Sequence, residues 1–183
     1  MEEQERREVL TELQDALKVF SSNERSYLLI PEVRTNLGYA VNGAKNVFDV
    51  AAVPGRVSVA FQRILYCLPP AFGASDHIAR VILTAMEFDQ RMRSAMNVIF
   101  HPKFLTLNPY VFDRASESTS DKQVERRTMN FMVRKAFEET GAIPELIVDK
   151  GDFGKEPGTF ILGRNPKEVV ERAFHLLSLI EER

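Results

Sequence analysis

Residues 146–180 read LIVDKGDFGKEPGTFILGRNPKEVVERAFHLLSLI, and this stretch predicts two strands followed by a helix. The short apolar runs at residues 146–149 and 159–162 flank a glycine-rich loop, a pattern typical of neighbouring strands. Asn165 then supplies a helix N-cap, a proline follows at the first helical position, and Glu168 completes a capping box. Because later apolar residues recur at helical spacing, we expect this helix to pack one face against a sheet.

Apolar residues at helical spacing also predict helices over residues 3–20, 75–86 and 124–140, the last one closed by a glycine. Residues 31–53 read as a loop that includes a short helix, and residues 116–121 as a polar loop. Further strands are predicted at residues 27–30, 56–61, 97–100 and 110–113. Strands and helices therefore alternate irregularly, and several connections are too short for a crossover helix. This pattern indicates an α/β protein with a mixed sheet.

Composition narrows the class of protein. The 183 residues carry 24 Lys and Arg against 26 Asp and Glu, and the net charge of −2 argues against a nucleic-acid partner. A single cysteine, Cys67, excludes an internal disulfide framework and any multi-cysteine metal site. No apolar run approaches the ~20 residues that a membrane helix needs, and the acidic N-terminus is unlike a signal peptide. We therefore expect a cytoplasmic protein with no membrane partner.

The net charge is unevenly distributed. Residues 1–24 hold seven acids and three bases, a net charge of −4, so the rest of the chain carries +2. Ordinary surface scatter would explain this distribution. A functional interpretation is that the body of the protein meets an anionic small molecule and that the acidic helix does not.

The segment GASDHIAR at residues 73–80 is the strongest local candidate for a site. Small residues lead into a helix start, where free backbone N–H groups and the helix dipole favour an anion. His77 and Arg80 lie on one face beside that start. The alternative is an ordinary capped helix with a surface histidine and arginine. Ser75, Asp76 and His77 cannot form a hydrolase triad, because neighbours on one turn do not line up as nucleophile, base and orienting group.

Other motifs are weaker on their own. Arg56 stands where a Pro-Gly turn enters a predicted strand. Residues 31–38 combine a proline that interrupts regular structure, an arginine and a flexible Asn-Leu-Gly. Residues 151–155, GDFGK, lack the spacing of a Walker loop. The three histidines are far apart in sequence, so we expect no metal site built from the chain.

Five blocks together carry a resemblance: IPEVRTNLGYA at 30–40, DVAAVPGR at 49–56, GASDHIAR at 73–80, SAMN at 94–97 and DKGDFGKEP at 149–157. They resemble the ThiN domain, the archaeal-type thiamine-phosphate synthase, which is often fused behind a hydroxymethylpyrimidine phosphate kinase. The resemblance runs from about residue 25 to the C-terminus. Residues 25–183 are therefore expected to form the ThiN-like domain, and residues 1–24 an acidic helix or the remnant of a linker.

The resemblance implies a three-layer α/β/α fold similar to the class II aldolase/epimerase type. It implies that hydroxymethylpyrimidine diphosphate and thiazole phosphate are joined to give thiamine monophosphate and pyrophosphate. Arg56 and His77 match the arginine and histidine that distinguish catalytic members. Mg²⁺ would arrive bound to the substrate. Residues expected to bind substrate are Arg34, Asn36, Gly38, Ser75, Arg80, Asn97, Asp149 and Lys155.

Alternative functions remain open at this point. The first is a sensor that binds thiamine phosphates without turnover. Such regulators carry a DNA-binding domain ahead of the ThiN part, and the 24-residue acidic segment here is too short and of the wrong charge for one. The second is a metal-dependent aldolase or epimerase, which the scattered histidines disfavour. A kinase domain, fused or associated, is an expected partner. The apolar stripe of residues 3–20 would either cover its own domain or pair two copies into a homodimer.

Overall fold

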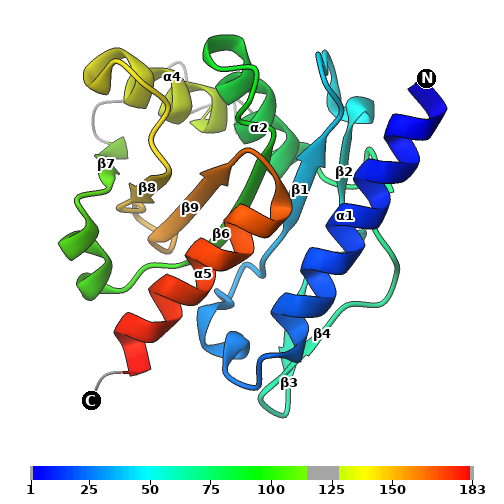
Figure 1. The fold of residues 1–183 in the computed structure, drawn as a ribbon. Helices are drawn as coiled ribbons and strands as arrows, with labels where there is room; N and C mark the ends of the chain where they lie inside the picture. Colours follow the sequence, from blue (N-terminus) through cyan, green and yellow to red (C-terminus); the bar gives the residue numbers. More distant parts are fainter. Residues whose placement is uncertain (1, 115–127, 182–183) are drawn as a thin grey trace.

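The computed structural model describes residues 2–114 and 128–181, and it is built around a seven-stranded mixed sheet (Figure 1). Its strand order is β5-β2-β1-β6-β9-β8-β7, and only the β7–β8 pairing is parallel. The predicted mixed sheet is therefore confirmed. The strands are β1 (Leu37–Ala40), β2 (Val50–Ala52), β5 (Ala71–Phe72), β6 (Ser94–Ile99), β7 (Tyr110–Phe112), β8 (Leu146–Asp149) and β9 (Gly158–Gly163).

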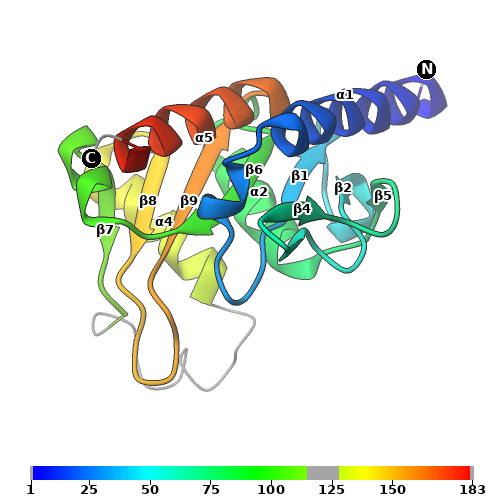
Figure 2. The same cartoon turned by 90° about the horizontal axis from the view of Figure 1, so that it is seen from below.

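Helices cover both faces of this sheet, which gives the expected three-layer α/β/α arrangement. Helices α1 (Glu2–Ser22) and α5 (Pro166–Glu181) lie side by side on one face, whereas α2 (Asp76–Phe88) and α4 (Thr128–Thr140) lie on the other (Figure 2). Aromatic rings join each pair. Phe20 of α1 stacks on Phe174 of α5 at 6.2 Å between ring centroids, and Phe88 of α2 stacks on Phe137 of α4 at 4.2 Å.

The acidic helix α1 belongs to the core. Its apolar stripe, which includes Leu13, Leu17 and Phe20, is fully buried against the sheet and α5, while its acidic side chains face outward. Near its start, Glu5 accepts hydrogen bonds from the backbone N–H and the side chain of Asn42, both at 2.6 Å. The boundary expected after residue 24 thus falls just after the end of α1, inside one shared core. The apolar stripe of α1 packs within its own domain.

The N-cap signals are confirmed. The Ser75 hydroxyl accepts a hydrogen bond from the Ile78 N–H at 3.4 Å at the start of α2. At the start of α5, the Asn165 side chain accepts from the Glu168 N–H at 2.9 Å, as expected for an N-cap. The other half of the capping box differs, because Glu168 accepts from the N–H of Arg164 at 2.9 Å, one residue before the cap. The Ser75 and Asn165 side chains occupy N–H groups that the first turn of a helix leaves without backbone partners, so both helix starts could be predicted from the sequence.

Two expectations between residues 27 and 53 were wrong, whereas the short helix expected there is present as the 3₁₀ helix Val47–Asp49, and a strand lies within residues 56–61 as expected. The segment predicted as a strand at 27–30 is a short 3₁₀ helix, Ser26–Leu29, and the supposed loop at 31–53 contains strands β1 and β2. Residues 56–61 contribute β3 (Ser58–Ala60), which pairs only with β4 (Arg63–Leu65) in a separate hairpin. Strand β1 escaped prediction because it is buried on both faces and so shows no alternation.

Part of the predicted secondary structure falls on residues that the structure does not describe. The polar loop at 116–121 and the first residues of the helix predicted at 124–140 lie outside the described residues. The single cysteine, Cys67, is exposed. Among the described residues no helix is long and apolar enough to span a membrane.

Candidate active site

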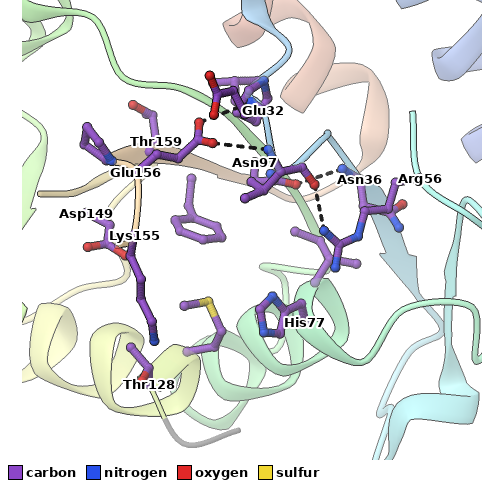
Figure 3. A pocket seen from close by; sticks show the side chains of 18 of the residues that line it. Glu32, Asn36, Arg56, His77, Asn97, Thr128, Asp149, Lys155, Glu156 and Thr159 are labelled. Atoms are coloured by element: carbon purple, nitrogen blue, oxygen red, sulfur yellow. Dashed lines mark hydrogen bonds between the residues drawn. The ribbon is translucent and has the colours of Figure 1, made fainter. Parts of the chain in front are cut away.

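A cleft of about 480 Å³ lies across the ends of several strands, where these ends meet helices α2 and α4 (Figure 3). Because neighbouring strands here are antiparallel, the cleft meets alternate strand ends: the start of β1, the end of β6, the start of β9 and the end of β8. We call this the main cleft. A second hollow of about 470 Å³ adjoins it. The two share the residues Val33, Asn36, Arg56, Ser75 and His77.

Arg56 and His77 lie at the junction of the two hollows (Figure 3). Arg56 follows the turn after β2, with a left-handed backbone (φ 67°) that is uncommon for any residue with a Cβ. Its Nη1 donates a hydrogen bond to the Val33 carbonyl at 2.7 Å, which aims the guanidinium along the cleft wall. His77 lies in the first turn of α2, beside Ser75. A guanidinium, an imidazole and a helix N-terminus thus lie together at this junction, and all three are groups that suit an anion.

Asn36 and Asn97 hold the backbone around this junction. The Asn36 amide donates to the Val53 carbonyl at 3.1 Å and accepts from the Val53 N–H at 2.9 Å, so the side chain pairs with the backbone that leads to Arg56. The Asn97 side chain accepts from the Asn36 N–H at 2.8 Å and donates to the Arg34 carbonyl at 2.9 Å. Both asparagines line the main cleft, and both use their amides to position the two arginine-bearing loops.

An ion pair lies at the opposite end of the main cleft. Arg114, which follows β7, donates from Nε and Nη2 to the carboxylate of Asp149 at the end of β8, at 2.6–3.1 Å. The two side chains are only 11% and 4% exposed. Asp149 also accepts from the Gly151 N–H at 2.9 Å. Sequence reasoning missed Arg114, because it stands before a polar stretch that matched no motif.

The β8–β9 loop returns across the main cleft and brings Lys155 and Glu156 to it. Gly151 makes this turn possible: its φ is 75°, and a Cβ there would collide with the Lys155 carbonyl. The Glu156 carboxylate accepts hydrogen bonds from the backbone N–H groups of Glu32 at 3.3 Å and Val33 at 3.2 Å. Glu156, which the sequence analysis did not single out, therefore ties this loop to the segment that leads into β1.

This tie predicts the effect of Glu156→Ala. Without the carboxylate, the Glu32 and Val33 N–H groups lose their partner, and we expect their hydrogen exchange to accelerate. A loosened cleft wall should raise KM by roughly 3- to 10-fold, the equivalent of about 1 kcal/mol or one ordinary hydrogen bond. Glu171→Ala on the exposed surface of α5 is the matched control. Unchanged exchange at Glu32 and Val33 would contradict the tie.

Of the remaining residues expected to bind substrate, two line a hollow and two lie outside both hollows. Arg34 lines the second hollow, and Ser75 lines both hollows. Gly38 does not reach either one: it lies in β1, where a Cβ would come within 2.9 Å of the Ile82 side chain of α2. Arg80 is one turn along α2 and pairs with Asp76 at 2.8 Å, also outside the lining. Gly38 therefore permits close packing of α2 on the sheet, and Arg80 braces the first turns of α2.

The histidines stay apart. His101 caps the 3₁₀ helix Pro102–Leu107 by accepting the Lys103 N–H at 3.2 Å, and His175 is exposed on α5. Over residues 2–114 and 128–181, no three His, Cys, Asp or Glu side chains gather as metal ligands would.

The fold and the cleft together define a class: an α/β enzyme domain with a cleft whose arginine, lysine and helix N-terminus suit an anionic small molecule. The family model described as "Thiamine-phosphate synthase ThiN" matches residues 12–175. The chain belongs to the thiamine-phosphate synthase ThiN family.

Three individual proteins are similar to the chain. The "Thiamine-phosphate synthase ThiN" of Methanothermobacter thermautotrophicus is 34% identical over 168 residues, which cover 88% of each protein. The "Bifunctional thiamine biosynthesis protein ThiDN" of Methanocaldococcus jannaschii is 32% identical over 84% of this chain and 37% of its own length. The crystal structure of the C-terminal domain of a phosphomethylpyrimidine kinase superposes with a TM-score of 0.85 at 33% identity, covering 94% of this chain and 100% of that domain.

Proposed function

We propose that the main cleft joins hydroxymethylpyrimidine diphosphate to thiazole phosphate, giving thiamine monophosphate and pyrophosphate. The observation that carries the proposal is the convergence of Arg56 and His77, from separate sequence motifs, at the N-terminus of α2. Thiamine-phosphate synthase is also the activity named for the relatives that match most of the chain.

The reaction makes particular demands on a protein. The bond between the pyrimidine methylene carbon and the diphosphate oxygen breaks, and the electron pair leaves with pyrophosphate. The electron-rich aminopyrimidine stabilises the positive methylene, and the thiazole nitrogen then donates its lone pair to form the new C–N bond. Catalysis therefore requires stabilisation of the departing anion and alignment of two flat rings. Apolar side chains suited to flat rings line the middle of the main cleft: Ile78, Val98, Met129 and Phe160.

The junction of the two hollows supplies the stabilisation. Arg56 keeps N–H donors beyond the one given to Val33, and a guanidinium matches a pair of phosphate oxygens. His77 is placed to donate a hydrogen bond to the same leaving group as its negative charge grows. Ser75 and the first turn of α2 add dipoles of the correct sign. We assign Arg56 and His77 the catalytic roles, and Arg34 the support of the diphosphate in the second hollow.

Mg²⁺ is proposed as a companion of the diphosphate. Of the three described carboxylates that line the main cleft, two already have donors, since Asp149 binds Arg114 and Glu156 binds backbone N–H groups; the third is Glu32. These residues suit a metal held mainly by phosphate oxygens and water, as is usual for Mg²⁺. The ion would supply charge neutralisation to the leaving group.

A direct assay tests the proposal. Purified protein is incubated with both substrates and Mg²⁺, and thiamine monophosphate and pyrophosphate are quantified together. We expect the two products in equal amounts and neither when one substrate is omitted. Tight binding of thiamine monophosphate without any product would reject the enzyme and favour a sensor.

The diphosphate substrate must itself be made by phosphoryl transfer to a pyrimidine monophosphate. A kinase carries out that class of reaction, and ThiDN, the bifunctional relative, combines two thiamine-biosynthesis activities in one protein. We propose that such a kinase, fused or separate, supplies this cleft. The homodimer stays a prediction, which light scattering of the purified chain checks.

A further inference from the structure

Arg114 and Lys155 form a second cationic group within the main cleft. Figure 3 shows Asp149 and Lys155 across the cavity from Arg56 and Asn36. The sheet order accounts for this separation, because Asp149 ends β8 while Asn36 precedes β1, three strand positions away. At about 4.8 Å per strand these two backbone positions are about 14 Å apart. One diphosphate group cannot bridge that distance.

Asp149 fixes the orientation of Arg114. The carboxylate takes the Nε and Nη2 side of the guanidinium, and Nη1 has no hydrogen bond to a described residue. A nearly buried guanidinium held on one side presents its remaining N–H groups in one direction. Asp149 is thus a positioning residue, and Arg114 is prepared to bind a further acceptor in the cleft that both residues line.

Lys155 supplies the uncompensated charge at this end. Its side chain forms no ion pair with the described part of the chain, and in Figure 3 it extends toward Thr128 of α4. Asp149 neutralises Arg114, and Glu156 beside Lys155 accepts from the backbone N–H groups of Glu32 and Val33. At the other end Arg34 and Arg56 form no ion pair with a described carboxylate, although Glu32 and Asp76 also line the two hollows.

We propose that Arg114 and Lys155 bind the monoester phosphate of the thiazole substrate, and that the Arg56 end binds the diphosphate. This assignment rests on the proposed function. The more highly charged diphosphate belongs at the end where two arginines lie beside the N-terminus of α2. The monoester belongs at the end with one uncompensated cation, and the apolar middle of the cleft then holds both rings between the two phosphate sites. The Lys155 end therefore determines selectivity for the phosphorylated thiazole.

Lys155→Ala tests the assignment by binding alone. Calorimetry compares thiamine monophosphate with thiamine, which differ only in the phosphate derived from the thiazole substrate. We expect the preference of the wild-type chain for thiamine monophosphate to fall on the order of 10-fold or more in the variant, as for the loss of a charge-assisted hydrogen bond. Affinities for thiamine and pyrophosphate should stay unchanged. In turnover assays only KM for thiazole phosphate should rise.

Lys150→Ala is the matched control, because Lys150 begins the same loop but pairs with Asp113 at 3.9 Å outside the cleft lining. Arg114→Gln combined with Asp149→Asn neutralises the buried pair without leaving a lone charge, and it should reproduce the Lys155→Ala loss of preference. A loss of pyrophosphate affinity in Lys155→Ala, or an unchanged preference for thiamine monophosphate, would overturn the assignment. A wild-type chain that binds thiamine monophosphate without turnover would reject the proposed reaction, and the binding comparison would still decide the phosphate site.

Discussion

Arg56→Gly is expected to lower turnover by about 10²-fold or more while the protein stays folded. The arginine is assigned to the departing diphosphate, and removal of one preorganised donor to such a charge typically costs about 10²- to 10³-fold. Its φ of 67° strains any residue with a Cβ by about 1 kcal/mol, and glycine relieves that strain. The free energy gained by relieving this backbone strain offsets the loss of the Arg56–Val33 hydrogen bond. It also offsets the greater conformational entropy that glycine gives the unfolded chain. Thermal unfolding checks that the variant stays folded, and steady-state kinetics measures the loss of turnover.

Gln62→Gly is a matched control for the backbone effect. Gln62 has a φ of 59°, is exposed in the β3–β4 hairpin and lines neither hollow. It should leave turnover unchanged. Arg56→Lys should also lose most activity, because an ammonium keeps the charge but not the fork that binds two oxygens. Full activity in Arg56→Gly would place the leaving group elsewhere.

His77→Ala is expected to lower turnover by about 10²-fold with little change in stability. The imidazole is exposed in the first turn of α2, and the helix retains its Ser75 cap without it. His77→Gln separates hydrogen bonding from proton transfer. If the imidazole acts only as a hydrogen-bond donor, glutamine should restore much of the rate. If it donates a proton, glutamine should fail and the pH dependence carried by this residue should vanish.

His175→Ala is the corresponding control, because His175 is exposed on α5, on the opposite face of the sheet from α2. It should leave the rate and the pH profile unchanged. An unaltered rate in His77→Ala would show that the N-terminus of α2 does not contact the reacting groups. Chemical-quench measurement of a single turnover checks that the affected step is bond cleavage rather than product release.

Local signals explain what could be predicted at the Arg56 end of the cleft. The Ser75 cap, the turn before Arg56 and the helix that carries His77 are each encoded within a few neighbouring residues. The resemblance to ThiN then grouped Arg56 and His77. Their proximity in space depends on the sheet, since the pairing of Asn36 with Val53 holds the loop that bears Arg56 beside the start of α2.

The other end of the cleft depends on contacts between distant parts of the chain. Arg114 and Asp149 are 35 positions apart, and Glu156 meets Glu32 across 124 positions. No local pattern marks such partners, because each residue alone resembles an ordinary surface charge. Strand β1 was missed for a related reason, since burial on both faces removes the alternation by which a strand is recognised.

The sequence by itself determined the helix starts, the mixed α/β class and the family, because capping, periodicity and motif spacing are properties of short segments. Only the tertiary structure decided that the acidic helix α1 belongs to the core, since the burial of Leu13 depends on β1 and α5. It also decided that the cations divide into two groups. Arg56 and Lys155 stand at opposite ends of one cleft because Arg56 packs beside the segment that leads into β1, whereas Lys155 belongs to the loop after β8, three strand positions away.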